Sequence, residues 1–391
     1  MNLYLALFLL FIVFCGAWFI GRFGTRHRTP EVESLPREYF RGLNFLLNEE
    51  RDKALEVLVT ALEKDKETIE VQLALGSLFR RRGEIQRATR VHQNLVARTQ
   101  LDKNQRLRAI YELAQDYYKA GLFDRAEHLL LEINDENDLE DSPKRLLLQI
   151  YEQEKEWEND ISIASQLPNL GSDKNEGIIA HYNCELAENS IAEGKYINAL
   201  SYISNAFKID SRCARAMIQA GRLKAIQGDH RGTVNEWMHG AKLHKELPGE
   251  ICHLIYNSFK VLNELEEYRD FLVDTLDSVD DIRLVLALTE YLTRYESEKK
   301  AEKFLLKKIR STPSISGLHR LIQLRLTRST GETNTDLHLL EKLIGSIVDE
   351  STGYACKHCG FQGKVMHWQC PGCRNWNTTQ ARIHQKLDVI S

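Results

Sequence analysis

Apolar residues recur at three- and four-residue spacing along most of the chain, which is the pattern of amphipathic helices. Strand-like alternation of apolar and polar residues is scarce before residue 350. Only seven prolines occur in 391 residues, so few helices are interrupted. The pattern changes at the two ends, where an uncharged apolar run and a cysteine-rich segment replace it. We therefore predict a mainly α-helical protein with a distinct segment at each end.

The helical region repeats itself every 34 residues. Gly42 and Ala54 are followed 34 residues later by Gly76 and Ala88. A second set returns in the same way: Ala187, Gly194, Ala199 and Ala206 recur as Gly221, Gly228, Thr233 and Gly240. Small side chains let paired helices approach closely, and a glycine between them permits a sharp reversal.

A helix pair every 34 residues resembles the tetratricopeptide family over roughly residues 36–330. The resemblance implies an α-solenoid of about eight or nine helix pairs over residues 36–348. Two stretches, 143–168 and 251–280, fit the pattern less well, and Asp160 stands where a small residue belongs. We interpret both stretches as degenerate helix pairs.

Residues 3–21 form an apolar run without a charge, close to the length that spans a bilayer as a helix. A cleaved secretory signal is the alternative, but no basic residue precedes the run and no small-residue cleavage site follows it. Three arginines at positions 22, 26 and 28 follow the run, and basic flanks stay in the cytoplasm. We therefore predict a transmembrane anchor at 1–21 with the N-terminus outside, a cytoplasmic linker at 22–35, and the remaining chain in the cytoplasm.

Four cysteines lie close together near the C-terminus in the spacing C-x2-C, ten residues, C-x2-C: Cys356, Cys359, Cys370 and Cys373. Two such turns can direct four sulfurs at one ion, the geometry of structural zinc or of an iron–tetrathiolate centre. Spacing leaves iron and zinc equally open. Residues 349–391 are therefore predicted to form a metal-binding module and tail, with one ion and no open coordination position.

The cysteine segment also resembles the rubredoxins, through Y-x-C-x-x-C-G-F at 354–361 and W-x-C-P-x-C at 368–373. Its ten-residue spacer is much shorter than in rubredoxins, and Arg374 stands where they have glycine. A module of this size cannot hold itself together by burial alone. We expect its aromatic residues to cover the cluster or to dock on the last repeats: Tyr354, Phe361, Trp368 and Trp376.

Charge and motifs exclude some classes of function. The formal net charge of −4 argues against a dedicated nucleic-acid binder. Residues 354–391 carry a charge of about +4, which suits nucleic acid, an acidic protein patch or an anionic membrane surface equally. The sequence contains no P-loop, dinucleotide-binding, zinc-protease or serine-hydrolase motif. We therefore predict a protein that is not an enzyme and assign no catalytic residue.

In the tetratricopeptide family the first helix of each pair lines a concave groove that binds proteins. If the first helix of each pair lines the groove in this chain too, eight residues are candidates for partner binding: Arg80, Arg81, Arg108, Tyr111, Tyr118, His181, Arg215 and Arg222. Arginines in this set can grip an acidic or extended partner through charge-assisted hydrogen bonds. The other interpretation is that these arginines are solvated and the tyrosines pack between repeats.

Anchor, helix-pair array and cysteine module, in this order, resemble the lipopolysaccharide assembly protein B family of Gram-negative inner-membrane proteins. The resemblance covers the whole chain. It implies a regulatory scaffold that works with a membrane ATP-dependent metalloprotease to control turnover of the lipid A pathway deacetylase. It also implies an inner-membrane partner that senses lipopolysaccharide. By this resemblance the anchor meets the protease or the sensor, and the repeats capture the deacetylase.

Other functions remain open on the residues alone. The cysteine site suits a membrane-tethered, rubredoxin-like electron carrier, and the repeats suit a general scaffold for envelope-biosynthesis enzymes without a protease. Small residues in the apolar run, Gly16 and Ala17 with Gly21, permit helix pairing and so a homo-oligomer.

Overall fold

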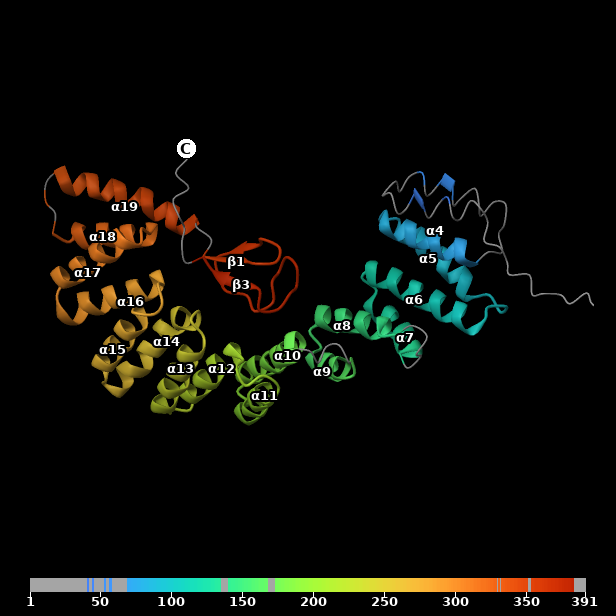
Figure 1. Ribbon diagram of the computed structural model, residues 1–391, viewed down its shortest axis with the longest axis horizontal. Coiled ribbons are helices and arrows are strands. Elements are labelled where there is room, and N and C mark those ends of the chain that lie inside the picture. The colour runs from blue at the N-terminus through green and yellow to red at the C-terminus, as the bar shows by residue number, and fades with distance from the viewer. Residues whose placement is uncertain are drawn as a thin grey trace, which may run out of the picture. The chain divides into compact units, whose positions relative to one another are not determined.

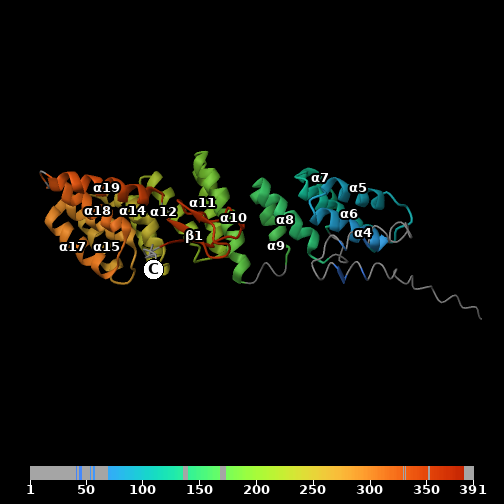
Figure 2. The same cartoon turned by 90° about the horizontal axis from the view of Figure 1, so that it is seen from above.

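The computed structural model describes residues 69–134, 140–167, 173–328, 330, 332–350 and 353–382, with a few helical positions between 41 and 57. The chain divides into two compact units, Met1–Leu146 and Leu147–Ser391 (Figures 1 and 2). The expected anchor at 1–21 and linker at 22–35 lie outside the described residues. Among those that are described, no helix is both long and apolar enough to cross a membrane.

Helices follow one another in antiparallel pairs, eight of them within the described residues. The helices of the first unit are α4 (Ile69–Arg81), α5 (Ile85–Val96), α6 (Lys103–Lys119) and α7 (Phe123–Ile133). Helix α8 (Ser142–Glu154) begins in the first unit and ends in the second. Those of the second unit are α9 (Trp157–Ser165), α10 (Asp173–Ala192), α11 (Tyr196–Ile209), α12 (Ala214–Ile226), α13 (His230–Leu243), α14 (Leu247–Leu262), α15 (Leu265–Leu276), α16 (Ile282–Tyr291), α17 (Glu298–Ser311), α18 (Ile315–Leu326) and α19 (Glu332–Glu350). A π-helical turn, η2 (Leu292–Glu296), follows α16. The predicted helix-pair solenoid is confirmed.

The 34-residue recurrence of small residues has a packing cause. A Cβ atom on Gly76 would lie 2.3 Å from the His92 ring, and one on Gly221 would lie 2.2 Å from the Trp237 ring. In both pairs the ring sits 16 residues after the glycine, on the second helix. The glycine therefore makes room for one large ring, and the array reuses this arrangement.

A left-handed residue ends the first helix in six of the pairs. The residues are Gly83, Gly121, Lys155, Gly194, Gly228 and Asn263. In each case the next N–H donates to a carbonyl five residues earlier, at 2.8 to 3.0 Å, which closes a Schellman-type cap. The two degenerate pairs keep this cap with lysine and asparagine, so the turn survives where its sequence signal is lost.

Apolar burial holds the repeats together. The largest buried cluster runs from α13 to α18 and includes Phe259, Leu272 and Leu305, all fully buried. Asp160, the polar residue in a small-residue position, is also fully buried, on α9.

The C-terminal module is a small antiparallel sheet with long turns. Its strands are β1 (Tyr354–Cys356), β2 (Gln362–Gly363) and β3 (Thr379–Ala381), in the order β2-β1-β3. Ala355 pairs with Gln362 on one side and with Gln380 on the other. The module lies on the inner side of the arc formed by the helices of the second unit (Figure 1).

Candidate metal centre and its docking surfaces

Two turns with the same backbone geometry present the four cysteines. In the first, Gly360 N donates to Cys356 O at 3.0 Å, and in the second, Arg374 N donates to Cys370 O at 2.8 Å. Both closing residues are left-handed, with φ of 76° at Gly360 and 60° at Arg374. Arginine therefore adopts here the conformation that glycine takes without strain, at a cost of about 1 kcal/mol. The departure from the rubredoxin sequence does not change the turn.

The four sulfurs are spaced for one tetrahedral ion. All lie within 4.8 Å of one another. The Sγ atoms of Cys356 and Cys373 are 3.7 Å apart, as are those of Cys359 and Cys370. A tetrahedron with metal–sulfur bonds of about 2.3 Å has edges of about 3.8 Å. The cysteine ligands predicted from spacing are thus brought together, and they fit a single zinc or iron ion.

Local hydrogen bonds act differently on the individual cysteines. The Thr378 hydroxyl lies 3.3 Å from Cys356 Sγ, and His358 N donates to the same sulfur at 3.4 Å. The hydrogen bond with Thr378, followed by backbone N–H groups of Cys359 and His358, lowers the pKa of Cys356 to about 5. The backbone N–H of Phe361 acts to lower the pKa of Cys359, but burial and the hydrogen bonds with the other three sulfurs raise this pKa to about 12. The thiolate, which is the form that binds metal, is therefore favoured at Cys356 but not at Cys359. Four such ligands close the coordination shell, which is the arrangement of structural centres.

The first docking surface, which we call the Trp376 dock, joins the module to α8, α9 and α10. Trp376 Nε1 donates to Glu152 Oε1 at 2.9 Å, and the Tyr182 hydroxyl donates to the same oxygen at 2.6 Å. The Trp376 ring stacks on His181 with centroids 5.2 Å apart. Trp157 and Tyr182 meet the Trp376 ring edge-on at 6.0 and 5.7 Å.

Two buried titratable groups lie at this dock. Burial, and then the charge of Arg215, lower the pKa of His181 to about 3, so its ring is neutral near pH 7. Burial, and then the carboxylates of Glu152 and Glu156, raise the pKa of Asp160 to about 8. Both oxygens of Asp160 lack a hydrogen-bond partner among the described residues. The dock is therefore an apolar and largely uncharged contact apart from Glu152.

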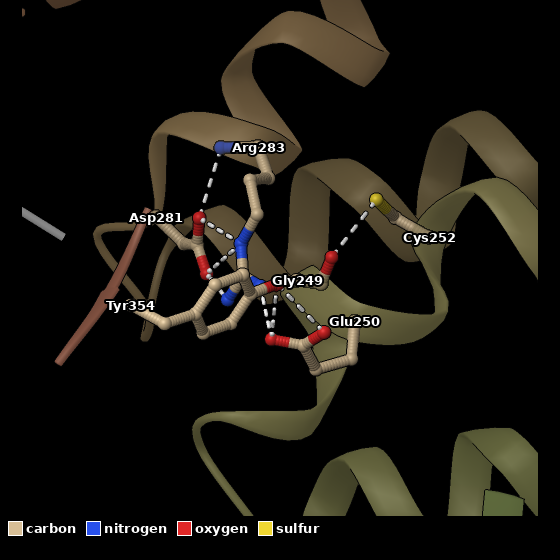
Figure 3. Close-up of polar contacts among 6 residues, drawn as sticks. All are labelled: Gly249, Glu250, Cys252, Asp281, Arg283 and Tyr354. Atoms are coloured by element: carbon tan, nitrogen blue, oxygen red, sulfur yellow. Dashed lines mark hydrogen bonds and ion pairs between the residues drawn. The ribbon is translucent and has the colours of Figure 1, made fainter. Parts of the chain in front are cut away.

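The second docking surface, the Tyr354 dock, joins β1 to α14 and α16 (Figure 3). The Tyr354 hydroxyl donates to Glu250 Oε2 at 3.0 Å and accepts from Arg283 Nη1 at 3.2 Å. Arg283 also pairs with Glu250, and its Nη2 lies 2.7 Å from Asp281 Oδ2. A Cβ atom on Gly249 would lie 2.1 Å from Asp281 Oδ2 and 2.3 Å from Arg283 Nη2, so a larger residue there would displace the ends of both side chains.

One guanidinium faces two carboxylates in this cluster. Burial opposes the charge of Arg283, but the hydrogen bond and charge of Asp281, and then Glu250, raise its pKa. Burial, and then Glu250, raise the pKa of Tyr354 to about 12, which keeps its hydroxyl a donor. Arg283 thus pairs with two carboxylates, and one of them, Glu250, accepts the hydrogen bond from Tyr354 of the module.

The sequence predicts that the aromatic residues cover the cluster or dock on the last repeats, and the structure places some of them on earlier helices as well. Trp376 contacts α8, α9 and α10, while Tyr354 contacts α14 and α16. Trp368 lies 5.7 Å from His181 between ring centroids, and Phe361 packs inside the module against Gly372. The reason is the curvature of the second unit, because the module lies on the inner side of the arc and can contact both its first helices and helices from its middle (Figure 1).

The candidate groove residues of the first unit have different environments. Arg80 is nearly buried and bridges to Glu112 and Asp116 on α6, so it holds two repeats together. Arg81 and Arg108 are exposed. Tyr111 and Tyr118 are half-buried, and Tyr118 lies against Phe123. Partner binding by these residues stays a prediction.

The candidate groove residues of the second unit also include both buried and exposed side chains. His181 faces the metal module at the Trp376 dock. Arg215 is buried and pairs with Glu185 at 2.7 Å, while the exposed Arg222 pairs with Glu188 at 2.7 Å. Partner binding by these residues also stays a prediction.

Sequence reasoning missed Glu152, Glu250, Asp281 and Arg283. Each is a charged residue in or next to a helix, and such residues usually face solvent, so the sequence carries no signal for them. The Pro248–Gly249 pair at the start of α14 is an unusual local sequence near this cluster. It does not by itself predict that the Asp281 and Arg283 side chains lie against Gly249.

The chain is similar to several known proteins. Residues 354–380 match the family described as the rubredoxin metal binding domain. Lipopolysaccharide assembly protein B of Escherichia coli K12 is 32% identical over 363 residues, which cover 92% of this chain and 93% of that protein. The Haemophilus influenzae protein of the same name is 28% identical, covering 94% and 96%. The solved structure of Pseudomonas aeruginosa PilF is 20% identical and covers 57% of this chain and 95% of its own, with a TM-score of 0.31.

Proposed function

The chain belongs to the lipopolysaccharide assembly protein B family, and we propose that it is a non-catalytic scaffold that regulates lipopolysaccharide biosynthesis. The single observation that carries this proposal is the 32% identity to a relative of that name over 92% of the chain. In this proposal residues 3–21 anchor the chain in the bacterial inner membrane with the repeats in the cytoplasm.

In this proposal the scaffold brings a protease and its substrate together at the membrane. The repeats hold the deacetylase of the lipid A pathway, and the anchor meets a membrane ATP-dependent metalloprotease and a lipopolysaccharide-sensing membrane protein. Joining protease and client on one tethered chain raises their effective concentration, to the millimolar range for short tethers. Regulation then requires only a competitor for the anchor or for the client surface.

The metal module has a mechanical role in this proposal. Bound metal supplies folding free energy to a segment that lacks an apolar core. The Trp376 dock then ties α8, α9 and α10 to the module, and the Tyr354 dock ties α14 and α16 to it. Because one rigid module touches both groups of helices, it fixes the curvature of the surface that receives a partner.

The experiment is a measurement of deacetylase turnover in cells that lack the chain. Re-expression of the full chain should restore rapid, protease-dependent degradation, and a chain without residues 1–21 should not. Membrane crosslinking followed by mass spectrometry should recover the protease and the deacetylase. An unchanged deacetylase half-life in the absence of the chain, with envelope enzymes crosslinked in place of the protease, would favour the general-scaffold function.

A further inference from the structure

Strand β3 is an edge of the small sheet, because it pairs with β1 alone. Lys357 N donates to Thr378 O, and Arg382 N donates to Gly353 O, each at 2.8 Å. Bonding in an antiparallel ladder alternates along the strand. The backbone N–H and C=O groups of Thr379 and Ala381 therefore point away from β1, and no backbone partner for them occurs among the described residues.

This free edge borders a cavity of about 650 Å³ between the module and the repeats. β3 forms one side of the cavity, and α10, the start of α12 and the start of α14 form the other. Several of its lining side chains are apolar: Ile178, Leu247, Met366, Trp368 and Trp376. A volume of this size lies within the range of sites that bury a ligand.

Two buried polar atoms at the cavity lack partners among the described residues. Thr379 is 4% exposed, and its Oγ1 makes no hydrogen bond. His181 is 5% exposed, and its Nδ1 makes none. Both residues line the cavity. A buried polar group left without a partner costs about 1–3 kcal/mol, so the wall of the cavity is polar as well as apolar at these two residues.

We propose that this cleft binds an extended peptide segment of another protein, which pairs with the free edge of β3 as a fourth strand. The unpaired backbone groups of Thr379 and Ala381 are spaced for every second residue of an extended chain. The apolar wall receives side chains at alternate positions of that segment, which favours apolar residues there. The inference goes beyond the proposed function, since it names a binding surface and a mode of recognition that depend on no pathway.

Selected peptides and backbone methylation test the pairing directly. Nine-residue peptides are selected from a random displayed library on the full-length, metal-loaded chain, and the tightest is synthesised. N-methylation of the residues that bond to β3 removes their donors and adds bulk at the edge. We expect alternate positions to lose about tenfold or more in affinity, while the intervening positions change about twofold or less.

A variant on the protein side tests the same edge. Ala381→Pro removes an N–H that points away from β1, so the pairing of β1 with β3 is retained. Gln362→Pro on the opposite edge strand is the matched control. We expect peptide affinity to fall about tenfold or more in the first variant and to stay within about twofold in the control. Metal content by mass spectrometry reports whether each variant is folded.

Several outcomes would overturn the proposal. One is that no selected peptide binds this face below millimolar concentration. Another is that methylation at every position has the same effect, or that A381P binds as the unchanged chain does. A third is that A381P converts a dimer into a monomer without any peptide binding, which would make a second copy the occupant. Should A381P fail to bind metal, the methylation series alone decides.

Discussion

The repeats and the metal module are stable for different reasons. Helices α4 to α18 bury apolar side chains completely, as at Leu130, Leu272 and Leu305. In residues 353–382 the buried residues are Cys356, Cys370 and Thr379. The module therefore has no apolar core, and its fold needs an ion inside and helices outside. Burial is sufficient where 34-residue units can stack, and chelation replaces it where the chain is too short to enclose a core.

The two regions also differ in the reach of their contacts. Repeats contact their sequence neighbours, whereas the module contacts residues far earlier in the chain. Tyr354 bonds to a residue 104 positions before it, and Trp376 to one 224 positions before it. The repeats can therefore form locally, while the module docks only on a completed second unit. Substitutions in the two regions should therefore have separable effects on metal binding and on the stability of the repeats.

Cys356→Ser should have the largest effect. Metal binding at such sites contributes on the order of 10 kcal/mol, so its loss should unfold residues 353–382. Amide hydrogen exchange should show lost protection in the module and retained protection in α12 and α13, and mass spectrometry should show no bound metal. Cys252→Ser, at a buried cysteine outside the site, serves as the control and should keep its metal. A Cys356→Ser chain with full metal content would contradict the ligand assignment.

Leu272→Ala should produce the converse result. Deleting this fully buried side chain removes about 2–5 kcal/mol from the stability of the repeats, measured by urea denaturation followed by circular dichroism. The native variant should still bind one metal ion. Val273→Ala, at an exposed position on the same helix, should change stability by about 0.5 kcal/mol or less. Equal effects of the two substitutions would show that this cluster does not hold the repeats.

Asp160→Ala should stabilise the repeats beside the Trp376 dock, and the gain should depend on pH. The pKa of Asp160 is raised to about 8 in the folded chain, against about 4 when unfolded. Between these values the folded state binds more protons, so this residue lowers stability progressively as the pH rises from 4 to 8. The difference in melting temperature between variant and parent should therefore be greater at pH 8 than at pH 5. A difference that stays constant with pH would show that the carboxyl ionises freely.

Arg374→Gly should have the smallest effect and the opposite sign to the cysteine substitution. Glycine adopts the left-handed conformation without strain, so the module should gain about 1 kcal/mol. Gly360→Ala, at the equivalent position of the first turn, is the matched comparison and should lose a similar amount. Metal affinity from competition with a chelator measures both. Weaker binding by Arg374→Gly would mean that the arginine side chain has a role that outweighs its strain.

The sequence alone determined the units from which this protein is built. The 34-residue recurrence predicted the helix pairs, because a glycine such as Gly76 or Gly221 is needed wherever one large ring fills the same gap. Cysteine spacing predicted the metal ligands, because two cysteines that are three positions apart can direct both sulfurs at one ion from a single tight turn. These are short-range requirements, and a short stretch of sequence can express them in full.

Only the tertiary structure decided where the module docks and which charges receive it. Glu250 and Arg283 have the sequence context of solvated helix residues, and their pairing with Tyr354 depends on the curvature of several stacked repeats. The free edge of β3 and the cavity beside it arise from the same docking. Curvature is the sum of many small packing angles between helices, so no single segment of the sequence records it, whereas a turn or a cysteine pair is recorded within a few residues.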